Sequence, residues 1–287
     1  MRLSCPGRPD WLRALAVPLA LAACTAPARA ADGPLPPPAA GLTYADLADL
    51  AEAAAIVARV TVAEQAEVKP ERAPGLAPGH ARLYLEVQTE RVLKGPGALA
   101  ESLKYLVDVP LDAKGKPPKL KKQSLLVFAH AVPGRPGELQ LVEPGSQFAY
   151  DQSLEARLRA VIAELVAPGA PPAVTGVRDA ISVAGNLAGE SETQMFVETA
   201  DGTPVSLTVI RRPGMAPEWG VSWSEIVDQA ARPPARGTLA WYRLACYLPR
   251  RLDRGAFLQA DEAGRRRAEA DYALVLDQLG PCERTRH

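Results

Sequence analysis

The chain has 287 residues, and its 33 lysines and arginines are balanced by 33 aspartates and glutamates. Without a net positive charge the sequence does not favour nucleic acid or an anionic membrane surface as a partner. Its length suits one large or two small domains, and we expect two.

The first 30 residues carry the three parts of a secretory signal peptide. Arginines at positions 2, 8 and 13 precede an apolar run over residues 14–23, and Ala28 and Ala30 form a small-x-small cleavage site. The run is far shorter than the roughly 20 residues of a membrane-spanning helix, so no transmembrane segment is predicted. We expect residues 1–30 to direct export, giving a periplasmic or secreted protein, and residues 31–41 to form a flexible leader.

A second processing route is open at Cys24. The residues Leu21, Ala22, Ala23 and Cys24 resemble a lipobox, in which the cysteine would be lipidated. The mature protein would then be a lipoprotein tethered to a membrane.

Two cysteines, Cys246 and Cys282, must lie in the mature chain, since Cys5 falls in the signal peptide and Cys24 is either removed or lipidated. In an oxidising compartment such a pair favours one disulfide. A pair so isolated is not expected to bind a metal, and it lacks the Cys-x-x-Cys spacing of redox sites.

The mature chain is predicted to begin with a short helix. Thr43 can cap its N-terminus, with Asp46 as the acidic partner of a capping box, and Leu42 can pack against Leu47. A second helix is predicted over about 154–165, because Leu154, with further apolar residues spaced three and four apart, traces one face.

Five strands are predicted between these helices. They span about 55–68, 81–94, 101–110, 124–132 and 138–143. Leu83, Leu85 and Val87 alternate with polar neighbours, as in a sheet with one buried face. The strand at 124–132 is apolar on both faces, so we expect it to be central. Residues 42–166 are thus predicted to form the first domain, and the Pro-rich residues 167–173 a linker.

Residues 174–287 are predicted to form a second, smaller α+β domain. Strand character at 174–184 and 219–223 flanks a hairpin whose turn contains Asp201 and Gly202. Further elements are hairpin strands at 195–199 and 204–210, a short helix at 224–231, a helix through Leu239, Tyr242 and Cys246, and a last helix from about Ala268 to Leu279. The cysteine pair can join the last two helices.

The first domain resembles a known architecture. The residues that carry the resemblance are Ala55 to Val60, Tyr84 to Val92, the sequence Leu93, Lys94, Gly95, and Leu125 to Phe128. In this order, over residues 43–150, the chain resembles exported bacterial five-stranded β-barrels of the OB-like or netrin-like kind, distantly similar to the inhibitory domain of tissue metalloproteinase inhibitors. The whole chain also resembles exported bacterial proteins of uncharacterised function.

The resemblance implies an α+β protein with an N-terminal barrel that binds protein, lipid or glycan on its loops. Metalloproteinase inhibitors act through a free N-terminal cysteine followed closely by another. No Cys-x-Cys exists in the mature chain, so that mechanism is not expected here.

No catalytic motif is found in the sequence. The three histidines, His80, His130 and His287, lack metal-ligand spacing, and no nucleophile elbow or nucleotide-binding loop occurs. We therefore predict no metal, no cofactor and no catalytic residue. His130, on the central strand, is interpreted as a core or rim residue.

A ligand or partner surface is predicted instead at Arg211 and Arg212 with Trp219 and Trp223. Guanidinium and indole groups stack on each other and are common at interfaces. The alternative is structural, with the arginines paired to Glu218 or Glu225. Two other basic groups, Lys114 to Lys122 and Arg265 to Arg267, are interpreted as solvated surface.

The function hypothesis is a noncatalytic exported envelope protein that binds another envelope protein or component. One alternative is an envelope hydrolase that uses His130 and a nearby carboxylate. A further alternative is a lipid-tethered structural protein, which requires lipidation of Cys24.

Overall fold

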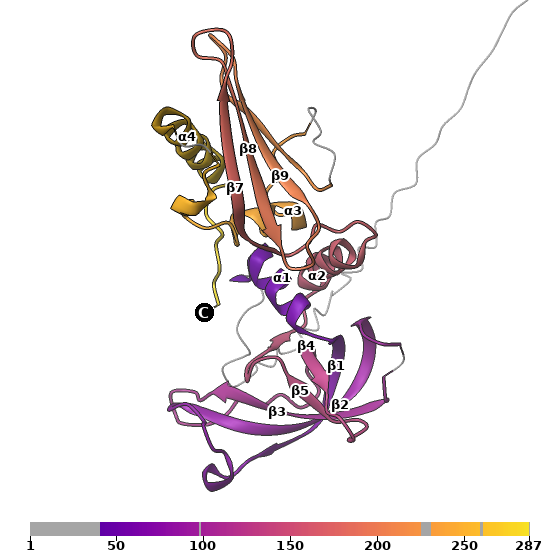
Figure 1. Ribbon diagram of the computed structural model, residues 1–287. Helices are drawn as coiled ribbons and strands as arrows, with labels where there is room; N and C mark the ends of the chain where they lie inside the picture. Colours follow the sequence, from indigo (N-terminus) through magenta and orange to yellow (C-terminus); the bar gives the residue numbers. More distant parts are fainter. Residues whose placement is uncertain (1–40, 98, 225–230, 259–260, 287) are drawn as a thin grey trace, which may run out of the picture. The chain divides into compact units, whose positions relative to one another are not determined.

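A computed structural model describes residues 41–97, 99–224, 231–258 and 261–286. The predicted signal peptide, Cys24, residues 31–40, His287 and most of the predicted helix at 224–231 lie outside these ranges. Within them the chain is α+β, with two antiparallel sheets and four helices (Figure 1). The helices are α1 (Tyr44–Ala53), α2 (Gln152–Val166), α3 (Leu239–Ala245) and α4 (Glu262–Leu279).

The first sheet has the strand order β3-β2-β1-β4-β5, and β6 pairs with β4. Its strands are β1 (Ile56–Glu67), β2 (His80–Lys94), β3 (Ser102–Pro110), β4 (Ser124–Ala131), β5 (Leu139–Leu141) and β6 (Gln147–Ala149). Among the described residues this sheet is not found closed into a barrel. Between β3 and the residue that precedes β5 there is one parallel bridge, from Lys104 to Glu138.

Strand β4 is central, as its apolar sequence predicted. Leu126 and Phe128 on one face join a core shared with the helices, whereas Leu125, Val127 and Ala129 on the other face join a second core inside the first sheet. Burial on both faces explains why this strand has no polar alternation.

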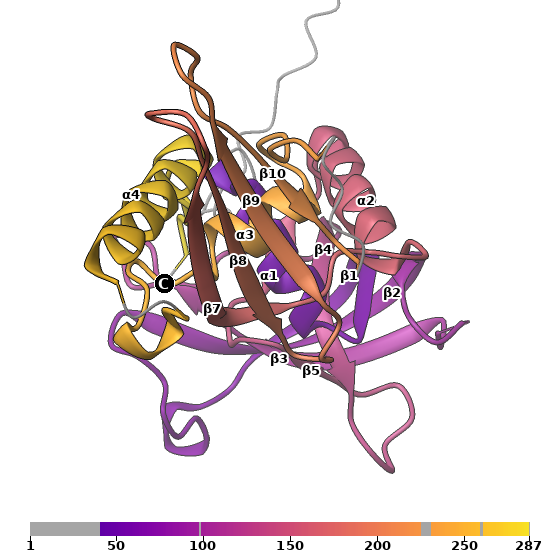
Figure 2. The same cartoon turned by 45° about the horizontal axis from the view of Figure 1, so that its top comes forward.

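The second sheet has the order β10-β9-β8-β7. Its strands are β7 (Val174–Ala184), β8 (Ser191–Thr199), β9 (Val205–Arg211) and β10 (Glu218–Ser222). The hairpin with Asp201 and Gly202 in its turn is confirmed, and Gly202 takes a φ of 76°, which suits glycine. Figure 2 shows α4 alongside β7, and α4 contacts both β7 and β8.

The start of α1 agrees with the sequence. Thr43 is its N-cap, and Asp46 completes the capping box. Leu42 and Leu47 are buried in the same core. Helices α1 and α2 of the first predicted domain both contact α3 of the second, so helices from the two predicted domains pack together.

Cys246, the residue that follows α3, is joined to Cys282, which follows α4, with 5.0 Å between their Cα atoms. The predicted pairing is therefore confirmed. Of the helices that the structure describes, none combines the length and apolarity needed to cross a membrane.

Candidate functional site

The predicted Arg and Trp surface is occupied by internal contacts. Arg211 Nε lies 2.6 Å from Asp271 Oδ1, and Arg212 Nη1 lies 2.9 Å from Glu218 Oε2. Trp219 is buried, and its Nε1 donates a hydrogen bond to Gln278 Oε1 at 2.8 Å. Trp223 is partly buried against the core. The four side chains therefore do not share one exposed face, and the structural alternative describes Arg212.

The partner of Arg211 belongs to a buried polar cluster that the sequence did not reveal. Asp271 lies on the inner face of α4 with 0% relative exposure. Thr193 donates a hydrogen bond to it and is itself within 2.8 Å of the Ser182 hydroxyl. The carboxylate is thus neutralised by Arg211 and hydrogen-bonded by Thr193, which suits a structural role.

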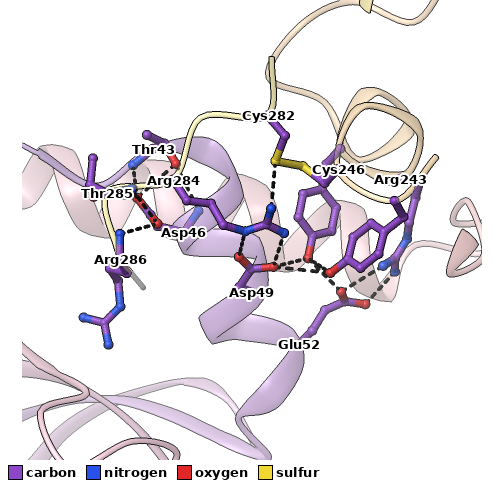
Figure 3. A network of polar contacts seen from close by, with 12 residues as sticks. Thr43, Asp46, Asp49, Glu52, Arg243, Cys246, Cys282, Arg284, Thr285 and Arg286 are labelled. Atoms are coloured by element: carbon purple, nitrogen blue, oxygen red, sulfur yellow. Dashed lines mark hydrogen bonds and ion pairs between the residues drawn. A yellow bond between two sulfur atoms is a disulfide. The ribbon is translucent and has the colours of Figure 1, made fainter. Parts of the chain in front are cut away.

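A second polar network joins α1 to the C-terminal segment (Figure 3). Arg284 binds Asp49 through Nε at 2.6 Å and Nη2 at 3.1 Å. One turn earlier, Asp46 accepts hydrogen bonds from the backbone N–H groups of Thr285 and Arg286. Residues 284–286 therefore lie on the acidic side of α1, just beyond the disulfide.

The same side of α1 binds α3. Arg243 Nη1 donates to Glu52 Oε2 at 2.8 Å, and the hydroxyl of Tyr242 is 2.6 Å from Asp49 Oδ1 and 2.8 Å from the Tyr247 hydroxyl. Burial, reinforced by the hydrogen bond with Asp49, raises the pKa of Tyr242. The phenol stays protonated and cannot serve as a base near neutral pH, so this network is interpreted as a clamp between elements.

His130 lies exposed near the end of β4, opposite Gln140 of β5. It is therefore a rim residue, which was one of the two predicted settings. A hydrolase would require a carboxylate and a hydroxyl within reach of its imidazole. In the described part of the chain no side-chain hydrogen bond to His130 is found.

A large concave feature lies along β3. We call it the β3 groove; it measures about 1010 Å³ and is lined by residues of β2 and β3, by residues 66–72, and by residues 132–144. Tyr84 and Leu106 are direct cross-strand neighbours in its wall, with 40% and 49% of their surface exposed. Two large exposed apolar side chains side by side are typical of a contact surface.

The groove carries an excess of unpaired positive charge. Arg82 binds Asp108 through two hydrogen bonds of 2.7 and 2.8 Å, and this pair is neutral. Lys69, Arg72 and Lys104 also line the groove, and none of them has an ion-pair partner among the residues that the structure describes.

The carboxylates of the groove do not offset this charge. Glu138 is paired with Arg135 and Glu143 with Arg286, which leaves Glu67 as the unpaired carboxylate of the described lining. Three unpaired cations against one unpaired carboxylate attract acidic groups.

The outer edge of β3 is covered by the chain itself. The N–H groups of Lys104 and Asp108 point away from β2, to the carbonyls of Gly137 and Pro144. Because these bonds flank Leu106, residues 137–144 run along this edge, and it is not free for a further strand.

One residue of the lining, Tyr105, is buried and hydrogen-bonded to a residue behind the groove. Tyr105 donates a hydrogen bond to Gln147 Oε1 at 2.9 Å, and burial raises the pKa of this tyrosine. The Gln147 Nε2 group is buried without a partner in the described chain. The groove therefore offers apolar contact and cations.

The sequence held one signal for this groove. Tyr84 and Leu106 occupy positions where the alternation of β2 and β3 calls for polar residues, and the sequence analysis predicts no site at them. Comparison of the chain with models of known protein families and with curated proteins found no match.

Proposed function

We propose that this chain is an exported, noncatalytic envelope protein that binds an extended acidic segment of another protein in the β3 groove. The observation that carries the proposal is the exposed cross-strand pair of Tyr84 and Leu106, which lies in a groove with three unpaired cations. Apolar contact with this pair would supply affinity, and the cations would select acidic residues.

Charge favours an acidic partner. Lys69, Arg72 and Lys104 would approach carboxylates of the bound segment, and desolvation in the groove would strengthen these contacts relative to open solvent. Tyr84 and Leu106 would contact its apolar side chains. The preferred segment therefore alternates acidic and apolar residues.

We also propose that the first sheet is a variant of the OB-like or netrin-like barrel. Support comes from its strand order and from the parallel bridge of Lys104 to Glu138, which links the two ends of the sheet. In OB-like barrels the face of the second and third strands is a common ligand surface, and the β3 groove lies on the same strands.

The proposed location is periplasmic or secreted, with tethering through a lipidated Cys24 as the alternative. It rests on the N-terminal sequence. Mass analysis of the mature N-terminus distinguishes the two forms.

The test is fluorescence anisotropy with a labelled peptide of alternating Glu and Val, and with a Lys and Val peptide as a probe of opposite charge. We expect saturable binding of the acidic peptide alone. Lys104→Glu should weaken it about tenfold or more, because an attraction becomes a repulsion. Arg265→Glu, at an exposed position of α4, is the matched control and should leave affinity unchanged.

Leu106→Asn separates apolar contact from charge. It replaces an exposed apolar side chain of the groove without changing any charge, so affinity for the acidic peptide should fall. Equal binding of both peptides, or an acidic peptide insensitive to Lys104→Glu and Leu106→Asn, would refute the proposal.

A further inference from the structure

One end of the second sheet carries two hairpin turns. Residues 185–190 join β7 to β8, and residues 212–217 join β9 to β10. Both turns lie at the same end, because Ala184 pairs with Ser191, and Ser191 pairs with Arg211. Figure 2 shows the two turns reaching past the end of α4, so they project from the sheet rather than enclose a cleft.

The first turn is exposed and uncharged. Residues 183–189 are all exposed, and none of them carries a charged side chain. Val183 exposes 58% and Leu187 63% of its surface. Exposed loop tips normally carry small and polar residues, so two large apolar side chains at such a tip indicate contact with an apolar partner.

The second turn adds Met215, which exposes 58% of its surface. Hydrogen bonds fix both turns. The N–H group of Met215 donates to the carbonyl of Arg212 at 3.1 Å, and the N–H group of Leu187 donates to the carboxylate of Glu190 at 3.2 Å. Because the turns are ordered in this way, a contact made by them loses little conformational entropy. We call residues 183–189 together with Met215 the apolar tip.

Charged residues of both signs begin directly behind the apolar tip. Glu190 and Glu192 lie at the start of β8, and Arg211 and Arg212 lie at the end of β9. Arg212 is paired with Glu218 at 2.9 Å. The base of the tip is therefore polar, and it does not present the cluster of unpaired cations that binding to an anionic surface through charge requires.

The size of the apolar tip argues against a protein partner. A stable protein interface buries roughly 800 Å² on each partner and involves about 20–30 residues a side. The tip offers three large apolar side chains on two projecting turns. A bilayer surface needs no matching concave shape, and binding to it grows with the apolar area that enters the boundary between headgroups and acyl chains.

We propose that the apolar tip inserts into the surface of a lipid membrane. Val183, Leu187 and Met215 enter the boundary between headgroups and acyl chains, and the charged residues behind them stay at the level of the headgroups. Apolar burial drives this insertion, so it does not require the net positive charge that the chain lacks.

The experiment is vesicle flotation of the mature chain, residues 31–287 without a lipid anchor, with phosphatidylcholine vesicles and, separately, with phosphatidylglycerol vesicles. We expect flotation with both, and we expect it to persist in about 0.5 M salt, which screens charges but leaves apolar contact in place. Leu187→Asp and Met215→Asp should each weaken binding about tenfold or more, because each removes apolar burial and brings a carboxylate to the acyl boundary.

Val166→Asp is the matched control. Val166 ends α2 and exposes 64% of its surface, so it undergoes the same kind of change at a position outside the tip. Its flotation should equal that of the wild type. Thermal unfolding of the three variants checks that they fold, and the two changes on different turns keep the test decisive if one variant fails to fold.

Absence of flotation, or equal flotation of the wild type, Leu187→Asp and Met215→Asp, would overturn the proposal. Flotation with phosphatidylglycerol alone that disappears in salt would overturn it as well, because charge and not insertion would then drive binding. A dimer in analytical ultracentrifugation that Leu187→Asp dissociates would show that a second copy of the chain covers the tip instead. Peptide binding in the β3 groove is measured separately, so the failure of one site is distinguishable from the failure of the other.

Discussion

Arg211 on β9 and Asp271 on α4 are joined by an ion pair, with 2.6 Å between Nε and Oδ1 and no exposed surface on the aspartate side chain. The pair holds the last long helix against the core face of the second sheet. Its partners are far apart in the sequence, so its contribution to stability appears only when the two elements are packed.

Asp271→Ala should destabilise the protein by about 3–5 kcal/mol, because the arginine and Thr193 would lose their partner in a buried setting. The measurement is the free energy of unfolding in urea. Glu218→Ala breaks the exposed pair with Arg212 and should cost no more than about 1 kcal/mol. Similar losses in the two variants would contradict the structural role assigned to Asp271.

The buried cluster around Asp271 also shows which features the sequence patterns could not predict. Strand β8 was predicted to begin at Met195, but it begins at Ser191 because the polar Thr193 is buried by its bond to Asp271. Asp271 lies on the apolar face of α4, where the helical pattern predicts an apolar residue. A pattern within one strand or one helix cannot show that two buried polar residues, Thr193 and Asp271, are hydrogen-bonded to each other.

The elements with local signals were predicted well. The capping box at Thr43, the central strand β4 and the hairpin turn each depend on residues close in sequence. Strand β6 was missed because its three residues are too short for alternation. The β3 groove was missed because its register places Tyr84 opposite Leu106, and the register is not visible in one strand alone.

The disulfide should stabilise the link between α3 and the C-terminal segment. The two cysteines are 36 residues apart, and closing such a loop is worth about 3–4 kcal/mol in the chain-entropy model. We expect dithiothreitol to lower the free energy of unfolding by about this amount. A Cys246→Ser, Cys282→Ser double variant should be equally destabilised and insensitive to the reductant; a wild-type protein unaffected by reduction would refute the prediction.

Asp46 should make stability depend on pH in the acid range. Burial alone would raise the pKa of this carboxyl, but the hydrogen bonds that it accepts from Thr43 and Thr285 outweigh burial and lower it. A lowered folded-state pKa means that the stabilisation is present above the unfolded-state pKa of about 3.9 and is lost as pH falls through the folded value.

Asp46→Asn should therefore cost roughly 2 kcal/mol at neutral pH and progressively less below about pH 4. Urea unfolding of both proteins across this range gives the difference directly. Glu269→Gln, which changes an exposed carboxylate of α4, serves as a control for the loss of one negative charge. A difference between wild type and Asp46→Asn that stays constant with pH would exclude Asp46 as the source.

Gly220→Ala tests the close approach of β10 to Ala231. The added Cβ would lie 2.3 Å from the backbone carbon and 2.4 Å from the carbonyl oxygen of Ala231, and backbone atoms cannot turn away as a flexible side chain can. We expect a loss of about 1–3 kcal/mol, typical of overpacking, in urea unfolding. Gly255→Ala is the matched control, because no heavy atom lies within 4 Å of its added Cβ. If both variants unfold alike, the contact between Gly220 and Ala231 does not constrain the fold.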